Sequence, residues 1–471
     1  MLRKISLENF KNWRELEIEL APISLLFGIN SAGKTGVLQS LLLLKQTARG
    51  FDPRQHLNFG GGDRDYTDFG SYQDLVHGHD QTRHLGISLS WDVPDGQFGM
   101  LMMTPEELHT AITADDLKRT TLSYDIRWKL DKDIFIERLG YSAILKEAPE
   151  FFARLIRRDD EKYALELSES FYDSSSEHED APSIEPGGNE ASEDESVESP
   201  ASCYMIPYSA IPSRKRRSMK VAPFMFNFEF ERLMESFYYL GPLRQYPRRY
   251  YQWTGDTKSQ VLDPDGADTI RTLVSSERDD RSLQQDVAEW LSRLELVQAL
   301  KVKSTDRNRR FYEVTVEVDG VESALVDVGF GVSQVLPVVT LLFSAPRGST
   351  VLLEQPELHL HPNAQSLLAD LMLYVAENRN LQLIVESHSE HILRRLQRRI
   401  AETELEFAKP DNIKMYFCEP GKGGSKISEV EVDRFGQISN WPEKFFGDIS
   451  GDLHTMVKSA LNRRRTELEN A

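Results

Sequence analysis

The chain has 471 residues, of which 40% are hydrophobic, and its 56 Lys and Arg residues against 75 Asp and Glu give a formal net charge of −19. This length exceeds one compact core and fits either about three domains or one large fold that carries an insertion. The negative charge argues against a protein that coats nucleic acid over its whole surface, while a local basic groove stays compatible with it. The two cysteines, Cys203 and Cys418, match no zinc or redox spacing and favour a reducing cytoplasm.

The N-terminal residues 1–7 begin directly with a strand-like alternation, so we expect no signal peptide. The longest apolar runs, 37–44 and 335–344, are much shorter than the roughly 20 residues that a membrane span requires. We therefore expect a soluble, cytoplasmic protein without a membrane partner.

The elements expected along the chain are those of an α/β fold. Residues 1–50 predict two strands, a short buried strand at 23–27, a loop and a leucine-rich helix. Residues 84–140 alternate and turn in the manner of an antiparallel sheet. The further elements are, in chain order, strands at 85–91 and 122–128, a helix at 280–300, a strand at 311–318, and buried strands at 350–353 and 381–385 that a helix separates.

The segment 163–213 differs from the rest because it carries twelve Asp or Glu residues, no Lys or Arg, and many serines. Such a composition cannot bury enough apolar surface to offset the entropy of ordering, so we expect a disordered acidic linker over about residues 165–213. A basic run at 214–217 follows directly. The two runs are either simply solvated, or they form a phosphorylatable or partner-binding segment.

An octapeptide at 28–35, Gly-Ile-Asn-Ser-Ala-Gly-Lys-Thr, follows the short buried strand and opens a helix. Two glycines around four residues, followed by Lys and Thr, let backbone amides approach a phosphate chain closely. We expect Lys34 to neutralise the outer phosphates and the Thr35 hydroxyl group to bind magnesium. The residues expected to hold the nucleotide here are Gly28, Asn30, Ser31, Ala32, Gly33, Lys34 and Thr35.

Three further segments carry polar groups that suit the same kind of site. The buried strand 350–353 ends at Glu354, and an acid in this position suits a magnesium-water ligand beside a phosphate loop. A glycine–serine turn at 329–334 opens a helix and offers amides to an anion, although an ordinary helix N-cap is the alternative interpretation. His388 follows the strand 381–385, where a lone histidine is usually unremarkable.

In this order and at these spacings, the four segments resemble the ABC-type ATPase heads of the SMC, RecF and OLD families, over about residues 1–90 and 320–420. The resemblance implies a mixed β-sheet with a phosphate-loop core, an antiparallel β subdomain, and an inserted, partly disordered segment. It also implies that ATP and Mg²⁺ are held between the heads of a homodimer or higher oligomer. The roles that follow from the resemblance are completion of the partner's nucleotide site for Gly331, Ser333 and Gln334, a γ-phosphate switch for His388, approach to the nucleotide for Lys11, and the magnesium-facing glutamine for Gln73.

The tail narrows the resemblance to a bacterial group of ABC-type ATPases, through residues 430–436 and the Trp-Pro-x-x-Phe-Phe segment at 441–446. The segments 240–244 and 355–362 resemble the same group. Members of this broader class often serve in defence against phage, beside a separate effector. The resemblance thus implies a sensor or scaffold that controls a separate nuclease or toxin.

One departure from the family pattern bears on catalysis, because Gln355 stands where these heads usually carry a catalytic Glu. An amide is no general base, and losing one costs about 10²–10⁴ in rate. Glu357 could replace it if the turn through Pro356 presents it; otherwise hydrolysis is slow and the ATP-bound dimer is the long-lived state. The expected catalytic group is therefore Glu354, Gln355, Glu357 and His388, acting as a weak ATPase.

Several other polar residues leave two interpretations open. His359 and His361 suggest either a metal site or, in better agreement with the resemblance, contacts to the partner subunit. Arginines and tyrosines mixed over 244–251 could grip a phosphate backbone or form core and interface contacts. The arginines at 394, 395, 398 and 399 fit either DNA contact or a solvated helix face.

These patches give an alternative function, a RecF-like DNA repair or maintenance ATPase that binds DNA. The ATPase of a membrane transporter fits the N-terminal strand and the tail less well. The expected domains are the two parts of the ATPase core at 1–90 and 321–420, an inserted β/α region at 91–320, and a tail module at 421–471.

Overall fold

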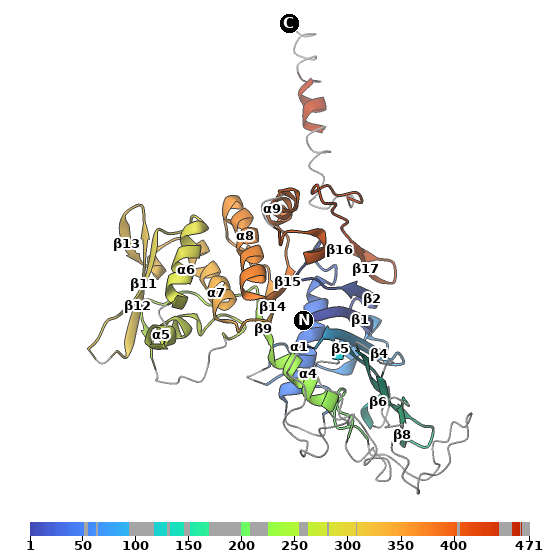
Figure 1. The fold of residues 1–471 in the computed structure, drawn as a ribbon. Coiled ribbons are helices and arrows are strands. Elements are labelled where there is room, and N and C mark those ends of the chain that lie inside the picture. The colour runs from blue at the N-terminus through green and yellow to red at the C-terminus, as the bar shows by residue number, and fades with distance from the viewer. Residues whose placement is uncertain are drawn as a thin grey trace.

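The computed structural model describes residues 1–50, 55–62, 65–93, 117–129, 132–145, 151–168, 199–207, 225–253, 262–279, 282–307, 309–402, 406–441, 455–461 and 463. Within these ranges, two large sheets, one small sheet and a set of helices enclose two hydrophobic cores (Figure 1). No helix in this part of the chain combines the length and the apolar character that crossing a membrane would need.

The central sheet has the strand order β17-β16-β3-β15-β14-β9. Five of its strands run parallel, and β17 pairs antiparallel with β16. The bounds are β3 Ile23–Gly28, β9 Phe237–Leu240, β14 Thr350–Glu354, β15 Gln382–Glu386, β16 Ile413–Gly421 and β17 Gly424–Glu429. Every residue of β3, β14 and β15 is buried, which explains why these strands read as continuous apolar runs. Because β15 lies between β3 and β14, three strands that are distant in sequence end side by side.

The second sheet is antiparallel, with the order β2-β1-β4-β5-β6-β7-β8. Its strands are β1 Leu2–Phe10, β2 Trp13–Glu19, β4 Leu85–Asp92, β5 Leu117–Lys129, β6 Lys132–Leu145, β7 Phe151–Arg157 and β8 Tyr163–Leu167. The antiparallel sheet expected from residues 84–140 is thereby confirmed. Together the two sheets confirm the α/β class, with a mixed sheet and an antiparallel subdomain.

Helix α1 (Lys34–Arg49) lies between the two sheets, and the opposite face of the central sheet is covered by further helices (Figure 1). Alternating residues of β3 make this division, because neighbours on a strand point to opposite faces. Leu26 shares a core with α1 and the antiparallel sheet, whereas Leu25 and Phe27 belong to the second core. The remaining helices are α2 Tyr72–Leu75, α4 Met225–Glu235, α5 Thr269–Asp279, α6 Ser282–Arg293, α7 Phe330–Ser344, α8 Pro362–Arg379 and α9 Glu390–Ala401, with short 3₁₀ turns at His77–His79, Leu325–Asp327 and Pro410–Asn412.

A small sheet sits beside α5, α6 and α7 at the left of Figure 1. It contains β10 Tyr251–Gln252, β11 Ala299–Ser304, β12 Phe311–Val318 and β13 Val321–Ala324. Strand β12 confirms the expected strand at 311–318. The helix expected at 280–300 is wrong beyond Arg293, because Glu295 adopts a left-handed φ of 58° and the chain then enters β11.

The expectation of disorder over about 165–213 is wrong for residues 165–168 and 199–207, which the structure describes. Strand β8 pairs with β7, and the Tyr163 hydroxyl group donates a 2.8 Å hydrogen bond to the carbonyl oxygen of Ile136. Near the other end, Cys203 and Ile206 are buried in the first core. The average composition of the whole segment conceals these short apolar stretches, which pack onto a sheet and a core formed by other parts of the chain. Most of the intervening acidic residues and the basic run 214–217 lie outside the described residues.

Candidate functional site

The loop at 28–35 joins β3 to α1 at the edge where the parallel strands end. Gly28 has a φ of 141° and pairs with Cys418 of the neighbouring strand, so an added Cβ would overlap the Cys418 carbonyl oxygen. Gly33 has a φ of 88°, and an added Cβ would lie 3.0 Å from the Trp13 ring. The Trp13 indole N–H donates a 2.9 Å hydrogen bond to the Gly33 carbonyl oxygen. Only glycine meets both demands, a left-handed backbone and close neighbours.

Lys34 is buried against its own loop. Its Nζ donates hydrogen bonds to the carbonyl oxygens of Gly28, at 3.1 Å, and Ile29, at 2.9 Å. Burial lowers the pKa of Lys34, and the nearby carboxylate of Glu386 opposes that shift. Of the other expected nucleotide-binding residues, Ala32 is buried in the core, whereas Asn30 and Ser31 are exposed.

Thr35, the expected magnesium ligand, contacts an acid that the sequence reasoning missed. Its Oγ1 donates a 2.8 Å hydrogen bond to Oε2 of Glu386, the last residue of β15. Glu386 is 3% exposed. The signal was present in the sequence, because the strand at 381–385 ends in an acid just as the strand at 350–353 does.

Glu354, the expected acid at the end of β14, is bound by a residue of β9, which pairs with β14 on the side away from β15. The hydroxyl group of Tyr239, on β9, donates a 2.9 Å hydrogen bond to Glu354 Oε1. Burial raises the pKa of Glu354 to about 7, the neighbouring charge of Glu386 adds to this, and the bond from Tyr239 opposes it. Tyr239 was not expected in the site, and nothing in its local sequence singles it out.

The turn after β14 fixes Gln355 and Glu357 in different ways. Gln355 has a left-handed φ of 44°, and its backbone N–H donates to the Glu386 carbonyl oxygen at 2.8 Å. Glu357 is 5% exposed, and its Oε1 accepts from Ser387 Oγ at 2.8 Å and from the His388 backbone N–H at 2.7 Å. Burial raises the pKa of Glu357. Its carboxylate therefore joins the turn after β14 to the turn after β15.

His388 is half-buried, and its backbone N–H takes part in this contact. Burial lowers its pKa, and the positive charge of Lys34 lowers it further. The structure thus brings His388, Glu357 and Lys34 of the phosphate loop into one neighbourhood.

The glycine–serine segment lies at the start of α7. An added Cβ at Gly331 would come 2.9 Å from the His359 carbonyl oxygen, and the rings of Phe330 and His359 pack edge to face at 4.9 Å. Ser333 is buried, and its hydroxyl group donates to the Phe330 carbonyl oxygen. Among the contacts of the described residues, no hydrogen bond joins Gly331, Ser333 or Gln334 to the phosphate loop of the same chain.

Arg244 links this segment to the carboxylate edge from inside the protein. It is 6% exposed and donates to the carbonyl oxygens of Gln334 at 3.4 Å, Glu354 at 3.1 Å and Gln355 at 3.4 Å. Burial lowers the pKa of Arg244 to about 10. Of the two interpretations open for this arginine, the structure supports the core contact.

Lys11 and Gln73 lie near the loop but differ in their contacts. Lys11 Nζ donates a 2.6 Å hydrogen bond to Gln39 on α1, and it lines a cavity of about 460 Å³ together with Ser31 and Asp74. Gln73 is exposed, and its amide oxygen accepts from Gln81 at 3.2 Å. Within the described part of the chain we find no contact between Gln73 and Thr35.

Among the described residues, the two histidines after β14 form no metal site with their neighbours. His361 caps α8, where its Nδ1 accepts from the Asn363 N–H at 3.4 Å, and the His359 ring packs on Phe330. The described residues contain no group of three or more His, Cys, Asp or Glu side chains that could hold a metal ion. Magnesium that arrives with a nucleotide does not require such a cage, because phosphates and water supply most of its ligands.

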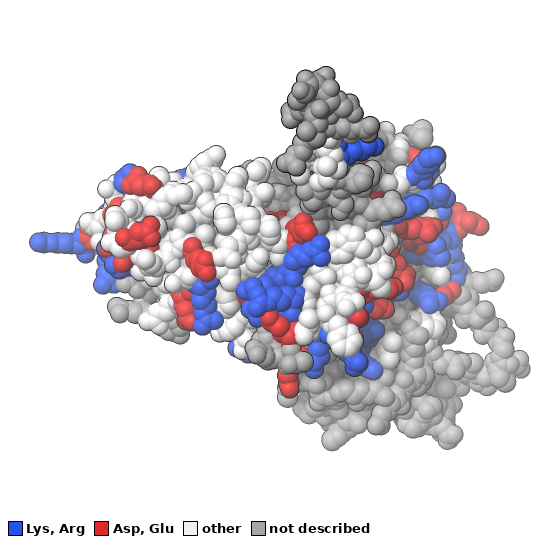
Figure 2. Space-filling view, turned by 90° about the horizontal axis from the view of Figure 1, so that it is seen from above, with Lys and Arg blue, Asp and Glu red and all other residues white. Residues whose placement is uncertain are grey.

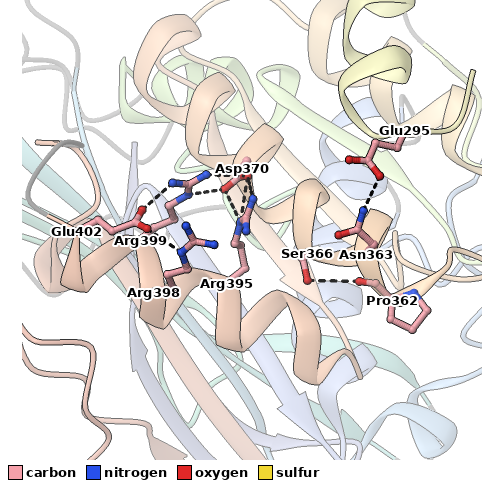
Figure 3. Close-up of polar contacts among 9 residues, drawn as sticks. All are labelled: Glu295, Pro362, Asn363, Ser366, Asp370, Arg395, Arg398, Arg399 and Glu402. Carbon is pink, nitrogen blue, oxygen red and sulfur yellow. Dashed lines mark hydrogen bonds and ion pairs between the residues drawn. The ribbon is translucent and has the colours of Figure 1, made fainter. Parts of the chain in front are cut away.

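Arginines of α9 form ion pairs with acidic residues of the same chain (Figure 3). Arg395 and Arg399 both bind Asp370 of α8, with closest distances of 2.7 and 2.8 Å, and Arg399 and Arg398 reach Glu402. Seen from above, basic residues gather near the middle of the face with acidic residues beside them (Figure 2). The ion pairs with Asp370 and Glu402 neutralise much of the positive charge on α9 that the sequence suggested for DNA contact.

A glycine-rich loop between a buried parallel strand and a helix, with acids at the ends of the next two strands, defines a phosphate-loop nucleotide-binding protein. The sequence profile of the AAA ATPase domain family matches residues 1–176 and 267–393. The chain belongs to this family, which makes ATP its nucleotide. The family described as a protein of unknown function (DUF3696) matches residues 409–456, and no curated protein matches the chain.

The solved structures that resemble the chain include SMC heads at low identity. The SMC head domain from Thermotoga maritima is 12% identical, with 92% of this chain and 99% of that chain covered and a TM-score of 0.39. An SmcHead bound to the C-winged helix domain of ScpA is 10% identical, with 92% and 98% covered and a TM-score of 0.43. An Smc head with an extended coiled coil, bound to the C-terminal domain of ScpA derived from Pyrococcus furiosus, is 8% identical, with 91% and 96% covered and a TM-score of 0.44.

Proposed function

We propose that the chain is an ABC-type ATPase that binds ATP with Mg²⁺ at residues 28–35 and closes this site on a second copy of itself. The observation that carries the proposal is the contact of the loop with the acid that ends β15, beside a second acid that ends β14. Thr35 contacts Glu386, and Glu354 is paired with Glu386 in the sheet register. Phosphoryl transfer depends mainly on positioning and on stabilising charge, and these groups are the kind that it uses.

The residues present fit a nucleotide triphosphate. The ammonium group of Lys34 is held by two loop carbonyls, and phosphate oxygens would give it charged acceptors, which bind more strongly. Bound Mg²⁺ neutralises phosphate charge. Oxygen ligands for it are available from Thr35 and from the acids that end β14 and β15.

The position of α7 supports a site shared between two copies. Gly331, Ser333 and Gln334 contact residues of their own lobe, namely His359, Phe330 and Arg244. Tyr246, which is 76% exposed, packs on Phe330 beside this helix start. A helix start attracts anions, so in this proposal the first turn of α7 approaches the ATP of the partner copy.

Nucleotide affinity and molar mass test the proposal together. We expect Lys34→Ala to lose most of its ATP affinity in calorimetry. We expect light scattering to show a dimer with Mg²⁺ and a non-hydrolysable ATP analogue, and a monomer for Gly329→Arg at the start of α7. An added side chain at Gly329 meets open space, so the variant should fold normally. Val321→Arg, at an exposed residue of β13, is the matched control and should still dimerise. A wild type that binds ATP but stays monomeric at all concentrations would refute the shared site.

We further propose slow hydrolysis, so that the ATP-bound dimer is the long-lived state. Gln355 cannot act as a base, and Glu357 is committed to Ser387 and His388. A slowly decaying dimer suits a sensor or scaffold better than a motor.

The cellular role that we propose is an anti-phage sensor in the cytoplasm that controls a separate effector protein, a nuclease or toxin. Support comes from the tail, where residues 430–441 fold onto α9. Gln397 donates a 2.8 Å hydrogen bond to the Gly436 carbonyl oxygen, and the Arg394 guanidinium lies 4.6 Å from the centre of the Trp441 ring. Phe435, 62% exposed, remains available to a partner. A deletion strain challenged with a broad phage panel tests the role, and unchanged sensitivity would speak against it.

The alternative is a RecF-like ATPase that binds DNA, although arginines of α9 pair with Asp370 and Glu402 of the same chain. Binding of duplex DNA over a salt series would decide between the two, because a protein that contacts several phosphates loses affinity steeply as salt rises.

A further inference from the structure

A cavity of about 420 Å³ lies between the small sheet and the helices α5 and α7, at the left of Figure 1. None of the described residues that line it belongs to the phosphate loop or to the strand ends that carry Glu354 and Glu386. The volume falls within the range of about 300–1,000 Å³ that is typical of small-molecule sites. The cavity therefore has room for a ligand that is separate from the ATP of the phosphate loop.

The segment 245–253 forms one wall of this cavity and is fixed at both of its ends. Arg249 forms an ion pair of 2.7 Å with Asp327, in the short turn before α7. Further along, the segment enters β10, where Tyr251 pairs with Tyr312 of β12. The wall thus joins the start of α7 to the small sheet.

Aromatic rings supply much of the lining. Trp253 and Tyr312 are buried and Tyr251 is half-buried, whereas Tyr246 and Tyr250 are exposed. The rings therefore extend from the interior of the cavity to the surface. Stacking on aromatic side chains is a contact that every nucleobase can make, because every base has a flat π face.

Charged groups of both signs complete the lining. Arg271 binds Asp268 at 2.7 Å, so these two charges balance. Partial burial raises the pKa of Asp263, and the neighbouring charges of Asp268 and Asp265 add to this, so a ligand that donates hydrogen bonds to Asp263 would relieve the crowding. Arg248 is exposed, and in the described part of the chain its guanidinium group has no acidic partner.

Helix α7 adds a backbone acceptor to the same wall. Pro337 lines the cavity and has no N–H, so the carbonyl oxygen of Ser333, four residues earlier, lacks its usual helix donor. Gly266 lets the loop before α5 approach this point, because an added Cβ there would lie 2.8 Å from the Pro337 ring. A ligand with amino hydrogens would supply the donor that the helix cannot.

This mixture of groups narrows the class of ligand. The two arginines disfavour a cation held in an aromatic cage, and the acids before α5 disfavour a long phosphate chain. We propose that the cavity is a second nucleotide site, which takes one nucleobase with a single phosphate group, as a free mononucleotide or as the end of a single strand. The base stacks on the rings and donates to Asp263, and Arg248 binds the phosphate group. The site goes beyond the proposed ATPase function and does not depend on it.

Mononucleotide binding to the full-length Lys34→Ala protein tests the site while the phosphate loop is disabled. In calorimetry we expect AMP, GMP and CMP to bind, and UMP, which lacks an amino group, to bind about tenfold more weakly. Adding Asp263→Ala should weaken AMP about tenfold and remove its advantage over UMP. Adding Arg248→Gln should weaken AMP about tenfold but leave adenosine unchanged. Asp319→Ala, at an exposed acid in the turn between β12 and β13, is the matched control and should change neither.

Photocrosslinking with 8-azido-AMP locates the ligand. The label should attach to peptides from residues 245–253, and Ala267→Phe, which adds a ring to the cavity wall, should abolish labelling in a protein that melting curves show to be folded. A 5′-phosphorylated oligodeoxynucleotide distinguishes the two sources, since binding at least tenfold tighter than AMP identifies a strand end and weaker binding identifies a free nucleotide.

Absence of binding by mononucleotide and oligonucleotide alike, or labelling that persists in folded Ala267→Phe, would overturn the second site. Because Lys34 lies outside the cavity, this result is distinguishable from a failure of the proposed function. A wild type without ATP affinity would remove the ATPase proposal and leave mononucleotide binding to the cavity unaffected.

Discussion

The hydroxyl group of Tyr239 donates a 2.9 Å hydrogen bond to the carboxylate of Glu354, across the edge of the central sheet. Burial and the nearby charge of Glu386 raise the pKa of Glu354 to about 7. In the absence of nucleotide, Glu354 therefore changes its charge near neutral pH. The hydrogen bond from Tyr239 opposes this rise in pKa because it favours the charged carboxylate.

Glu354 should make the folded state pH-dependent. An unfolded Glu ionises near its ordinary pKa of 4.5, so between pH 4.5 and about 7 the folded protein holds an extra proton and loses stability as pH rises. The decrease in the free energy of unfolding is complete above pH 7 and amounts to about 3 kcal/mol at most. We expect Glu354→Gln to gain stability relative to wild type between pH 5 and pH 8 in urea unfolding. A difference between the two proteins that stays constant with pH would contradict this.

Gln355→Glu should speed ATP hydrolysis if the missing base limits turnover. The gain expected for a correctly placed general base is about 10²–10⁴. Steady-state phosphate release measures it, with Gln355→Ala as the control that removes the amide without supplying a base. Equal turnover in wild type and Gln355→Glu would show that another step limits the rate.

Glu357→Gln should leave turnover within about tenfold of wild type, well below the loss expected for removal of a general base. The amide oxygen can still accept from Ser387 and His388, whose donors now hold the carboxylate. Glu357→Ala removes both bonds and should destabilise the protein by about 2–4 kcal/mol. Fast turnover in wild type that collapses in Glu357→Gln would instead identify Glu357 as the base.

Arg244→Lys should cost stability although it keeps the charge. The guanidinium reaches three backbone oxygens on two elements, and an ammonium group cannot span them. We expect a loss of about 2–4 kcal/mol in unfolding experiments. Arg248→Lys, at an exposed arginine of the same segment, is the control and should change stability by less than about 0.5 kcal/mol.

Asp370→Asn should loosen the contact between α8 and α9. Burial opposes ionisation, but hydrogen bonds from Arg399 and Arg395 hold the pKa of Asp370 below its ordinary value. Removing the charge leaves two partly buried guanidinium groups without their main partner, at a cost of about 1–3 kcal/mol. Glu402→Gln, at the solvent side of the same cluster, should cost less than about 1 kcal/mol. Equal costs for the two variants would show that the network contributes only as a surface feature.

The local features of this protein can be identified from its amino-acid sequence. Glycine spacing identified the loop at 28–35, because only certain backbones let amides approach a phosphate. Continuous apolar runs identified β3, β14 and β15, because strands buried on both faces need no polar side. Alternation of polar and apolar residues indicated the antiparallel sheet, because successive side chains of a strand point to opposite faces. The acid that ends β14 was also visible in the sequence.

Which of these parts contact one another depends on the three-dimensional fold. Thr35 and Glu386 come together because β15 inserts between β3 and β14, and strand order leaves no periodic trace in the sequence. Tyr239 reaches Glu354, and Arg244 reaches α7, through equally distant pairings. Helix α6 ends at Arg293, and the chain then forms β11, which pairs with β12 of the small sheet. Local helix propensity does not include the stabilisation that this pairing provides. Hydrogen bonds between side chains depend on positions in space, so the partner of each acid became known only when the strands were placed side by side.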